Sequence, residues 1–273
     1  MKPRKMNKLV LGGICIMLFV KMNYPLIDFL YTCNKLERNI ADMGPVEHIK
    51  LFRKLNLKVI VENQHKLYSP ILCNGAIVIA NHHTILEGSA ICAVIDLIKA
   101  RMCSKVLTAK VLFPTKVVDR YILNLVDGVK LVKNASETIS KALTPGRFLL
   151  IFPSGSIVAT KFKPGFLVYA TRRNLPIMPV WVDFHYPFIF QQIFKSLAIF
   201  NQNLAEKVCI YLGFFFYQKK TLRIRFGDPI PADYDKYQDV LQKKRRFTQA
   251  EIDIYRALVD SISKDKVESR YVY

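Results

Sequence analysis

The chain has 273 residues, of which 51% are hydrophobic and 12% aromatic, so it is long and apolar enough to bury a core and is not intrinsically disordered. Its 41 Lys and Arg against 21 Asp and Glu leave a net charge of +20, which favours a polyanion or an anionic membrane surface as neighbour. No nucleic-acid partner is expected, because the charge is dispersed and neither zinc-ligand spacing nor an RNA-recognition aromatic motif is present.

The N-terminus combines basic and apolar residues. Four basic residues precede a run of apolar or small ones from Leu9 to Val20. As a helix this run is about 18 Å long, against a hydrocarbon core of about 30 Å. Polar residues and Pro25 interrupt its extension towards Leu30. We therefore expect residues 1–35 to form a basic flank and a membrane anchor at the cytoplasmic face, either interfacial or marginally spanning; a signal peptide and an ordinary buried helix are the alternatives.

Residues 36–240 alternate between strand and helix patterns, as one medium domain would. Leu57 to Glu62 alternates like a strand, whereas Ala76 to Ala80 is a wholly apolar strand that precedes a helix ending near Ala100. The later expected strands are at 105–109, 129–132, 148–152 and 221–226, and the later expected helices are at 116–126 and 136–143. This alternation predicts an α/β fold with a largely parallel central sheet flanked by helices.

Polar residues stand where the apolar strand Ala76–Ala80 ends. His82 follows the strand, and Glu87 lies five positions later in the first turn of the expected helix. Strand ends that open onto helix starts are where open α/β sheets keep their sites. An imidazole held by a carboxylate can take a proton from a hydroxyl, as acyl transfer to an alcohol requires. The alternative is that Glu87, with Thr84, only caps the helix.

A second candidate region follows the strand Phe148–Phe152. In the loop after it, Gly155 allows close backbone approach, and amide groups can face a ligand. Lys110 and Lys133 each end another expected strand, and both can reach the same rim to bind an anionic acceptor as point charges. Solvated surface positions are the alternative for both lysines, and a turn position is the alternative for Ser156. The candidate substrate-binding residues are Lys110, Lys133, Phe152, Pro153, Ser154, Gly155 and Ser156.

The last part of the chain is aromatic and basic. Residues 181–220 interleave aromatic side chains with lysines, which is typical of a membrane interface or the border of an acyl channel, with plain core packing as the alternative. Residues 241–273 contain a basic run and a helix that Thr248 and Glu251 cap and that reaches about Ser263. We treat this C-terminal segment as separate from the domain before it.

Five stretches match the motifs of a known family, in that family's order. They are Asn81-His82 with the acid Glu87, Gly128 to Lys133, Phe152 to Ser156 with Phe162 to Gly165, Leu175 to Val180, and Ile224 to Ile230. Together they resemble the glycerolipid acyltransferases, the family of the lysophosphatidic acid acyltransferases. The resemblance implies an O-acyltransferase in which His82 is the general base and Glu87 its orienting acid. It assigns the acceptor site to the loop 152–156 with Lys110 and Lys133.

The sequence departs from the family pattern at two motifs. Glu87 stands where the family has aspartate, which shifts the carboxylate by about one bond length. Ser154 replaces the glutamate of the third motif, and Ile157 and Val158 stand where an arginine is expected. The acceptor is then something other than lysophosphatidic acid, or its phosphate is held elsewhere.

The resemblance also implies how the acyl group arrives. The acceptor hydroxyl attacks the thioester directly, acyl-CoA or acyl-carrier protein is the co-substrate, and a lysophospholipid or related glycerolipid is the acceptor. No acyl-enzyme, metal or bound cofactor is implied, and the six cysteines, which include no C-x-x-C pair, are expected as reduced thiols. Three alternatives stay open: a degenerate family member that binds anionic lipid without catalysis, a serine hydrolase, and a nucleic-acid-binding protein.

Overall fold

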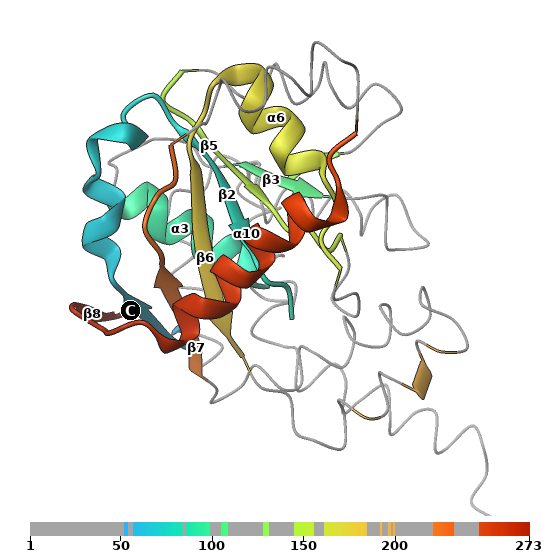
Figure 1. Ribbon diagram of the computed structural model, residues 1–273. Coiled ribbons are helices and arrows are strands. Elements are labelled where there is room, and N and C mark those ends of the chain that lie inside the picture. Colours follow the sequence, from blue (N-terminus) through green and yellow to red (C-terminus); the bar gives the residue numbers. More distant parts are fainter. Residues whose placement is uncertain are drawn as a thin grey trace, which may run out of the picture.

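The computed structural model describes residues 52–53, 57–83, 86–98, 105–108, 128–130, 145–155, 161–184, 192, 196–197, 199, 221–231 and 246–273 (Figure 1). The strands are β1 (Lys58–Glu62), β2 (Ala76–Ala80), β3 (Lys105–Thr108), β4 (Gly128–Lys130), β5 (Phe148–Ile151), β6 (Ile177–Asp183), β7 (Thr221–Phe226) and β8 (Arg270–Val272). The α-helices are α3 (Leu86–Ile98), α6 (Gly165–Arg173) and α10 (Gln249–Ser261), and the 3-10 helices are η2 (Gln64–Tyr68), η3 (Pro70–Leu72) and η4 (Ile262–Lys264).

The strands form a single sheet in the order β4-β3-β5-β2-β6-β7-β1-β8. Neighbouring strands run parallel except at β6–β7 and β1–β8, which are antiparallel. The predicted α/β fold with a largely parallel sheet is therefore confirmed. Strand β2 lies between β5 and β6, so the polar residues that follow it face the ends of two parallel neighbours.

Strand β2 is buried on both faces of the sheet. Ala76, Val78 and Ala80 belong to one hydrophobic cluster, which also contains the buried face of α3. Ile77 and Ile79 belong to a second cluster, with residues of α6 and α10. Figure 1 shows these two helices on the opposite side of the sheet from α3. Because successive side chains of a strand point to opposite faces, a wholly apolar strand needs helices on both, as predicted.

A tight turn sets where β2 begins. Gly75 has a φ of +94°, and a Cβ at this position would lie 2.1 Å from the carbonyl oxygen of Arg147. The Gly146 amide donates to the Asn74 carbonyl at 3.0 Å, and the Ala76 amide donates to that of Arg147 at 3.3 Å. Only glycine fits this left-handed position. The turn brings the starts of β2 and β5 together.

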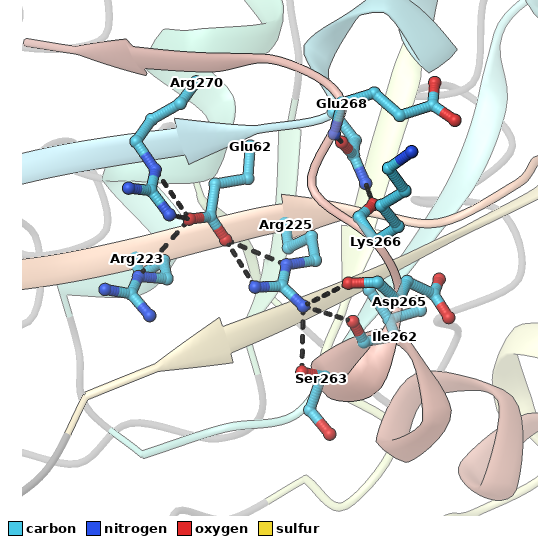
Figure 2. A network of polar contacts seen from close by, with 10 residues as sticks. Glu62, Arg223, Arg225, Ile262, Ser263, Asp265, Lys266, Glu268 and Arg270 are labelled. Carbon is cyan, nitrogen blue, oxygen red and sulfur yellow. Dashed lines mark hydrogen bonds and ion pairs between the residues drawn. The ribbon is translucent and has the colours of Figure 1, made fainter.

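The buried side chain of Glu62 connects three strands, β7, β1 and β8, at one edge of the sheet (Figure 2). Glu62 of β1 is fully buried, and its Oε2 accepts from Nε of Arg225 in β7 at 2.8 Å, while its Oε1 accepts from Nη2 of Arg270 in β8 at 2.8 Å. The guanidinium of Arg223 lies 3.6 Å from the same carboxylate. Nη1 of Arg225 also donates to three carbonyls after α10, those of Ile262, Ser263 and Asp265. The network therefore fixes the C-terminal strand to the sheet.

Several expectations differ from the structure or lie outside the described residues. Strand β5 ends at Ile151, one residue earlier than expected, and the C-terminal helix continues after Ser261 as the 3-10 turn η4. The segment 241–273, set apart in the sequence, contributes α10 to the core and β8 to the sheet. The expected anchor at 1–35 and the helices at 116–126 and 136–143 lie outside the described residues. Within the residues described, none of the helices has the length and apolar character needed to cross a bilayer.

Candidate active site

The candidate site lies at the edge of the sheet where β2, β5 and β6 end. These three strands are parallel neighbours, so the residues after Ala80 and Ile151 meet at one edge, beside the last residues of β6. His82 and Phe152 leave β2 and β5 there. The topology therefore brings together two stretches that the sequence placed far apart, as strand ends in open α/β sheets commonly do.

His82 is held by Glu87, as the sequence predicted for this pair. Nδ1 of His82 lies 2.9 Å from Oε2 of Glu87. The Glu87 side chain is fully buried, whereas 16% of the His82 side chain is exposed. Since a carboxylate only accepts hydrogen bonds, Nδ1 carries the proton in the neutral ring and Nε2 holds a free electron pair. This is the tautomer that a general base needs.

Glu87 also binds the backbone that precedes its helix. The amide of His83 donates to both carboxylate oxygens, at 2.9 Å to Oε1 and 3.0 Å to Oε2. The two interpretations of Glu87, helix cap and orienting acid, are therefore compatible, because one carboxylate accepts from the backbone and from the ring. These contacts compensate the burial of its charge. Thr84, the other expected capping residue, lies outside the described residues.

Asn81 fixes the position from which His82 leaves the strand. Its Oδ1 accepts from the Val182 amide at 2.7 Å, and its Nδ2 donates to the Val182 carbonyl at 2.7 Å. Nδ2 also donates to Nε2 of His83 at 2.8 Å. The side chain thus continues the β2–β6 ladder by one step beyond Ala80. Asn81 was matched to a motif in the sequence but was given no role, although a polar residue directly after an apolar strand signals a cap of this kind.

The loop after β5 lies against the histidine. The ring of Phe152 stacks on that of His82, with centroids 4.0 Å apart and planes inclined by 19°. Within the loop, the Gly155 amide donates to the Phe152 carbonyl at 2.9 Å, and Gly155 has a φ of +66°. The Ser154 side chain is buried. The Pro153 carbonyl accepts from the Lys163 amide at 2.8 Å. His82, Glu87 and the loop from Phe152 to Gly155 therefore form one cluster.

Three predicted binding residues lie outside the described residues: Lys110, Lys133 and Ser156. The structure places another cation at the loop, since a Cβ built on Gly155 would lie 3.2 Å from Nζ of Lys163. Sequence reasoning included Lys163 in a motif without assigning it a role. The available signal was its position two residues before Gly165, in the stretch that was matched to the same motif as the loop.

A histidine oriented by a buried carboxylate, at the strand ends of an α/β sheet and beside a glycine-containing loop, defines an acid–base site of the kind that acyl-group transfer uses. The model of the Acyltransferase family matches residues 58–183, from β1 to the end of β6, and this range contains the whole cluster. Over this segment the chain is similar to the acyltransferase family, and the resemblance found in the sequence is confirmed for residues 58–183. A search of the curated proteins found no match.

Proposed function

We propose that this acyltransferase moves a fatty acyl group from an acyl thioester to a hydroxyl of a lysophospholipid or related glycerolipid, with His82 as general base and Glu87 as its orienting acid. The observation that carries the proposal is the 2.9 Å contact between Nδ1 of His82 and Oε2 of the buried Glu87. In the neutral ring this contact leaves Nε2 unprotonated, and 16% of the His82 side chain is exposed.

The proposed reaction needs a single displacement. Nε2 of His82 takes the proton of the acceptor hydroxyl as its oxygen bonds to the thioester carbonyl carbon. The resulting imidazolium is stabilised by the Glu87 carboxylate. The carbon–sulfur bond then breaks, and the departing thiolate takes the proton from the imidazolium. Ester and free thiol are the products, and the histidine returns to its starting tautomer without forming a covalent intermediate.

The co-substrates and location follow from the same proposal. Acyl-CoA or acyl-carrier protein delivers the acyl group, and no metal or bound cofactor takes part. The lysolipid acceptor is drawn from an anionic membrane surface at the cytoplasmic face, which the net charge of +20 supports. The changes at Ser154, Ile157 and Val158 favour a second candidate, a family member that binds anionic lipid without turnover. The intact contact between His82 and Glu87 favours the enzyme.

The test is His82→Ala, assayed with long-chain acyl-CoA and a panel of lysolipids by mass detection of the product. Loss of a positioned general base is expected to lower kcat by about 10²–10⁴-fold. His65→Ala is the matched control, because His65 lies in η2 and contacts Ser269 and Glu268 of the C-terminal segment instead. Equal activity of folded His82→Ala and wild type would refute the role of His82. A wild-type protein that binds anionic vesicles but turns over no acceptor would support the second candidate.

A further inference from the structure

We propose that His83 is a second catalytic side chain, whose Nδ1–H donates a hydrogen bond to the carbonyl oxygen of the acyl thioester. The inference rests on the proposed function and adds a group that stabilises the negative charge on this oxygen while the acceptor hydroxyl attacks. In the proposed reaction, His82 takes the proton and Glu87 stabilises the imidazolium, but neither of them binds the oxygen. A donor aimed at such an oxyanion contributes about 10²–10³-fold to kcat in well-studied enzymes.

Hydrogen bonds fix where the proton of the His83 ring lies. The backbone of Val182 orients the Asn81 amide, because an N–H only donates and a carbonyl only accepts. Oδ1 of Asn81 therefore faces the Val182 amide, and Nδ2 faces the Val182 carbonyl, each at 2.7 Å. Nδ2 has a second hydrogen to donate, and it lies 2.8 Å from Nε2 of His83, so this ring nitrogen accepts. In the neutral ring the proton of His83 is consequently on Nδ1.

The neighbouring imidazoles of His82 and His83 leave opposite hydrogen-bonding groups free. In His82 the N–H is bound to Glu87, and the electron pair of Nε2 is free. In His83 the electron pair is bound to Asn81, and Nδ1–H has no hydrogen-bond partner within the part of the chain that the structure describes. His83 is also partly exposed. One ring therefore offers a substrate an acceptor and the other offers it a donor, the two groups that attack on a carbonyl needs.

The fold places both histidines at one edge of the sheet. Strand β2 lies between β5 and β6. His82 contacts Phe152, which follows β5, and His83 is connected through Asn81 to β6. The His83 amide also donates to Oε1 of Glu87 at 2.9 Å, so the acid that orients the base holds the backbone of His83 as well. Because the attacking oxygen and the carbonyl oxygen become bonded to the same carbon, base and oxyanion donor must be neighbours, as these two residues are.

The alternative is a structural role, in which Nε2 of His83 only satisfies Asn81. His83→Gln and His83→Met separate the two roles in kinetic assays with long-chain acyl-CoA. Glutamine can accept from Asn81 with its oxygen and donate to a substrate with its NH₂ group, whereas methionine can do neither. We expect His83→Met to lower kcat by about 10²–10³-fold with little change in KM, and His83→Gln to recover most of this loss. His65→Met, in η2, is the control for replacing a histidine outside the site.

The carbonyl stretch of a bound acyl thioester reports the hydrogen bond without turnover. Difference infrared spectra would be recorded on the full chain in detergent micelles, with acyl-CoA labelled with ¹³C at its carbonyl and no acceptor present. The band should lie at a lower wavenumber in wild type, His82→Ala and His83→Gln than in His83→Met. A wild-type band that is not shifted from that of free acyl-CoA, or one that His83→Met leaves in place, would overturn the proposal, as would wild-type kcat in folded His83→Met.

The infrared measurement also separates this inference from the proposed function. If His82→Ala turns over as fast as wild type, the proposed role of His82 fails. A band that is shifted in wild type and returns towards that of free acyl-CoA in His83→Met would still assign the hydrogen bond to His83.

Discussion

His82 and Phe152 lie face to face, their ring centroids 4.0 Å apart, although they follow two different strands. The bond from Nδ1 of His82 to Glu87 fixes one edge of the imidazole. The phenyl ring covers one of its faces. A ring held at an edge and at a face has little freedom to rotate, so the direction of Nε2 is set before a substrate arrives. Preorganisation of this kind reduces the free-energy cost of orienting the imidazole during the reaction.

Replacing Phe152 by leucine should therefore lower the rate of acyl transfer. Leucine keeps an apolar side chain at the position but removes the flat surface on which the imidazole rests. We expect kcat to fall by roughly ten-fold or more, because small misplacements of a catalytic group are costly. Steady-state kinetics would measure this, with Phe152→Tyr as the control that keeps an aromatic ring. Wild-type kcat in folded Phe152→Leu would show that the stack does not position the base.

Glu87→Gln should impair both stability and catalysis. The carboxylate accepts from the His82 ring and from the His83 amide, and a glutamine amide must turn its NH₂ group towards one of these donors. One buried hydrogen bond is then lost, at a cost of about 1–3 kcal/mol in the free energy of unfolding. The imidazolium also loses its counter-charge, so kcat should fall by about 10²-fold or more. Urea unfolding and kinetics would measure the two effects.

Glu87→Asp is the complementary change, because it restores the acid usual in the family. The shorter side chain cannot reach both His82 and the His83 amide from the present backbone position, where both contacts are close to 2.9 Å. We expect a smaller loss of kcat than for Glu87→Gln, since the charge remains. An aspartate variant more active than wild type would contradict the view that this site is fitted to the longer acid.

The sequence predicted those contacts of the site that join residues close together in the sequence. An apolar run between a turn and a polar stretch placed β2, and His82 and Glu87 are only five positions apart, so local geometry brings them together. The contacts of Asn81 with Val182, 101 positions away, depend on which strand lies beside β2. Periodicity within one segment contains no information on strand order, so this contact and the stack on Phe152 could not be foreseen.

Two strands were missed for different physical reasons. Strand β6 contains Pro179, which lacks an amide proton and therefore argues against a central strand. In the structure Pro179 nevertheless lies opposite Ile79 in the parallel pairing of β6 with β2. Strand β8 is only three residues long, and its side chains are exposed, so burial imposes no pattern on its sequence. Its attachment depends instead on Arg270, which reaches Glu62 from 208 positions away.

Asn81→Asp should destabilise the edge of the sheet. Asparagine donates to the Val182 carbonyl and accepts from the Val182 amide, whereas an aspartate can only accept. The change leaves the carbonyl unpaired and removes the bond to His83. We expect a loss of about 1–3 kcal/mol in the free energy of unfolding, together with a lower kcat because His82 is the next residue. Thermal unfolding would test this; unchanged stability would mean that the two bonds to Val182 contribute little.

The network around Glu62 predicts unequal effects for its two closest arginine partners. Glu62 is fully buried and Arg225 is 7% exposed, whereas Arg270 is 54% exposed. Removing one partner of a buried ion pair leaves the other charge uncompensated, at a cost of about 3–5 kcal/mol. Glu62→Ala and Arg225→Ala should both approach this loss. Arg270→Ala should cost only about 1 kcal/mol or less, because solvent screens the exposed guanidinium and Glu62 keeps its bond to Arg225.

Urea unfolding of the three single variants would separate these contributions, and hydrogen exchange at the Tyr273 amide would report on β8 itself. That amide donates to the Val59 carbonyl at 2.9 Å, beside the pairing of β8 with β1. In Arg270→Ala its exchange should accelerate while global stability changes little, because only the edge strand is released. If Arg270→Ala lowers global stability as much as Glu62→Ala, then β8 unfolds together with the core, and the exposed ion pair contributes far more than its solvent screening allows.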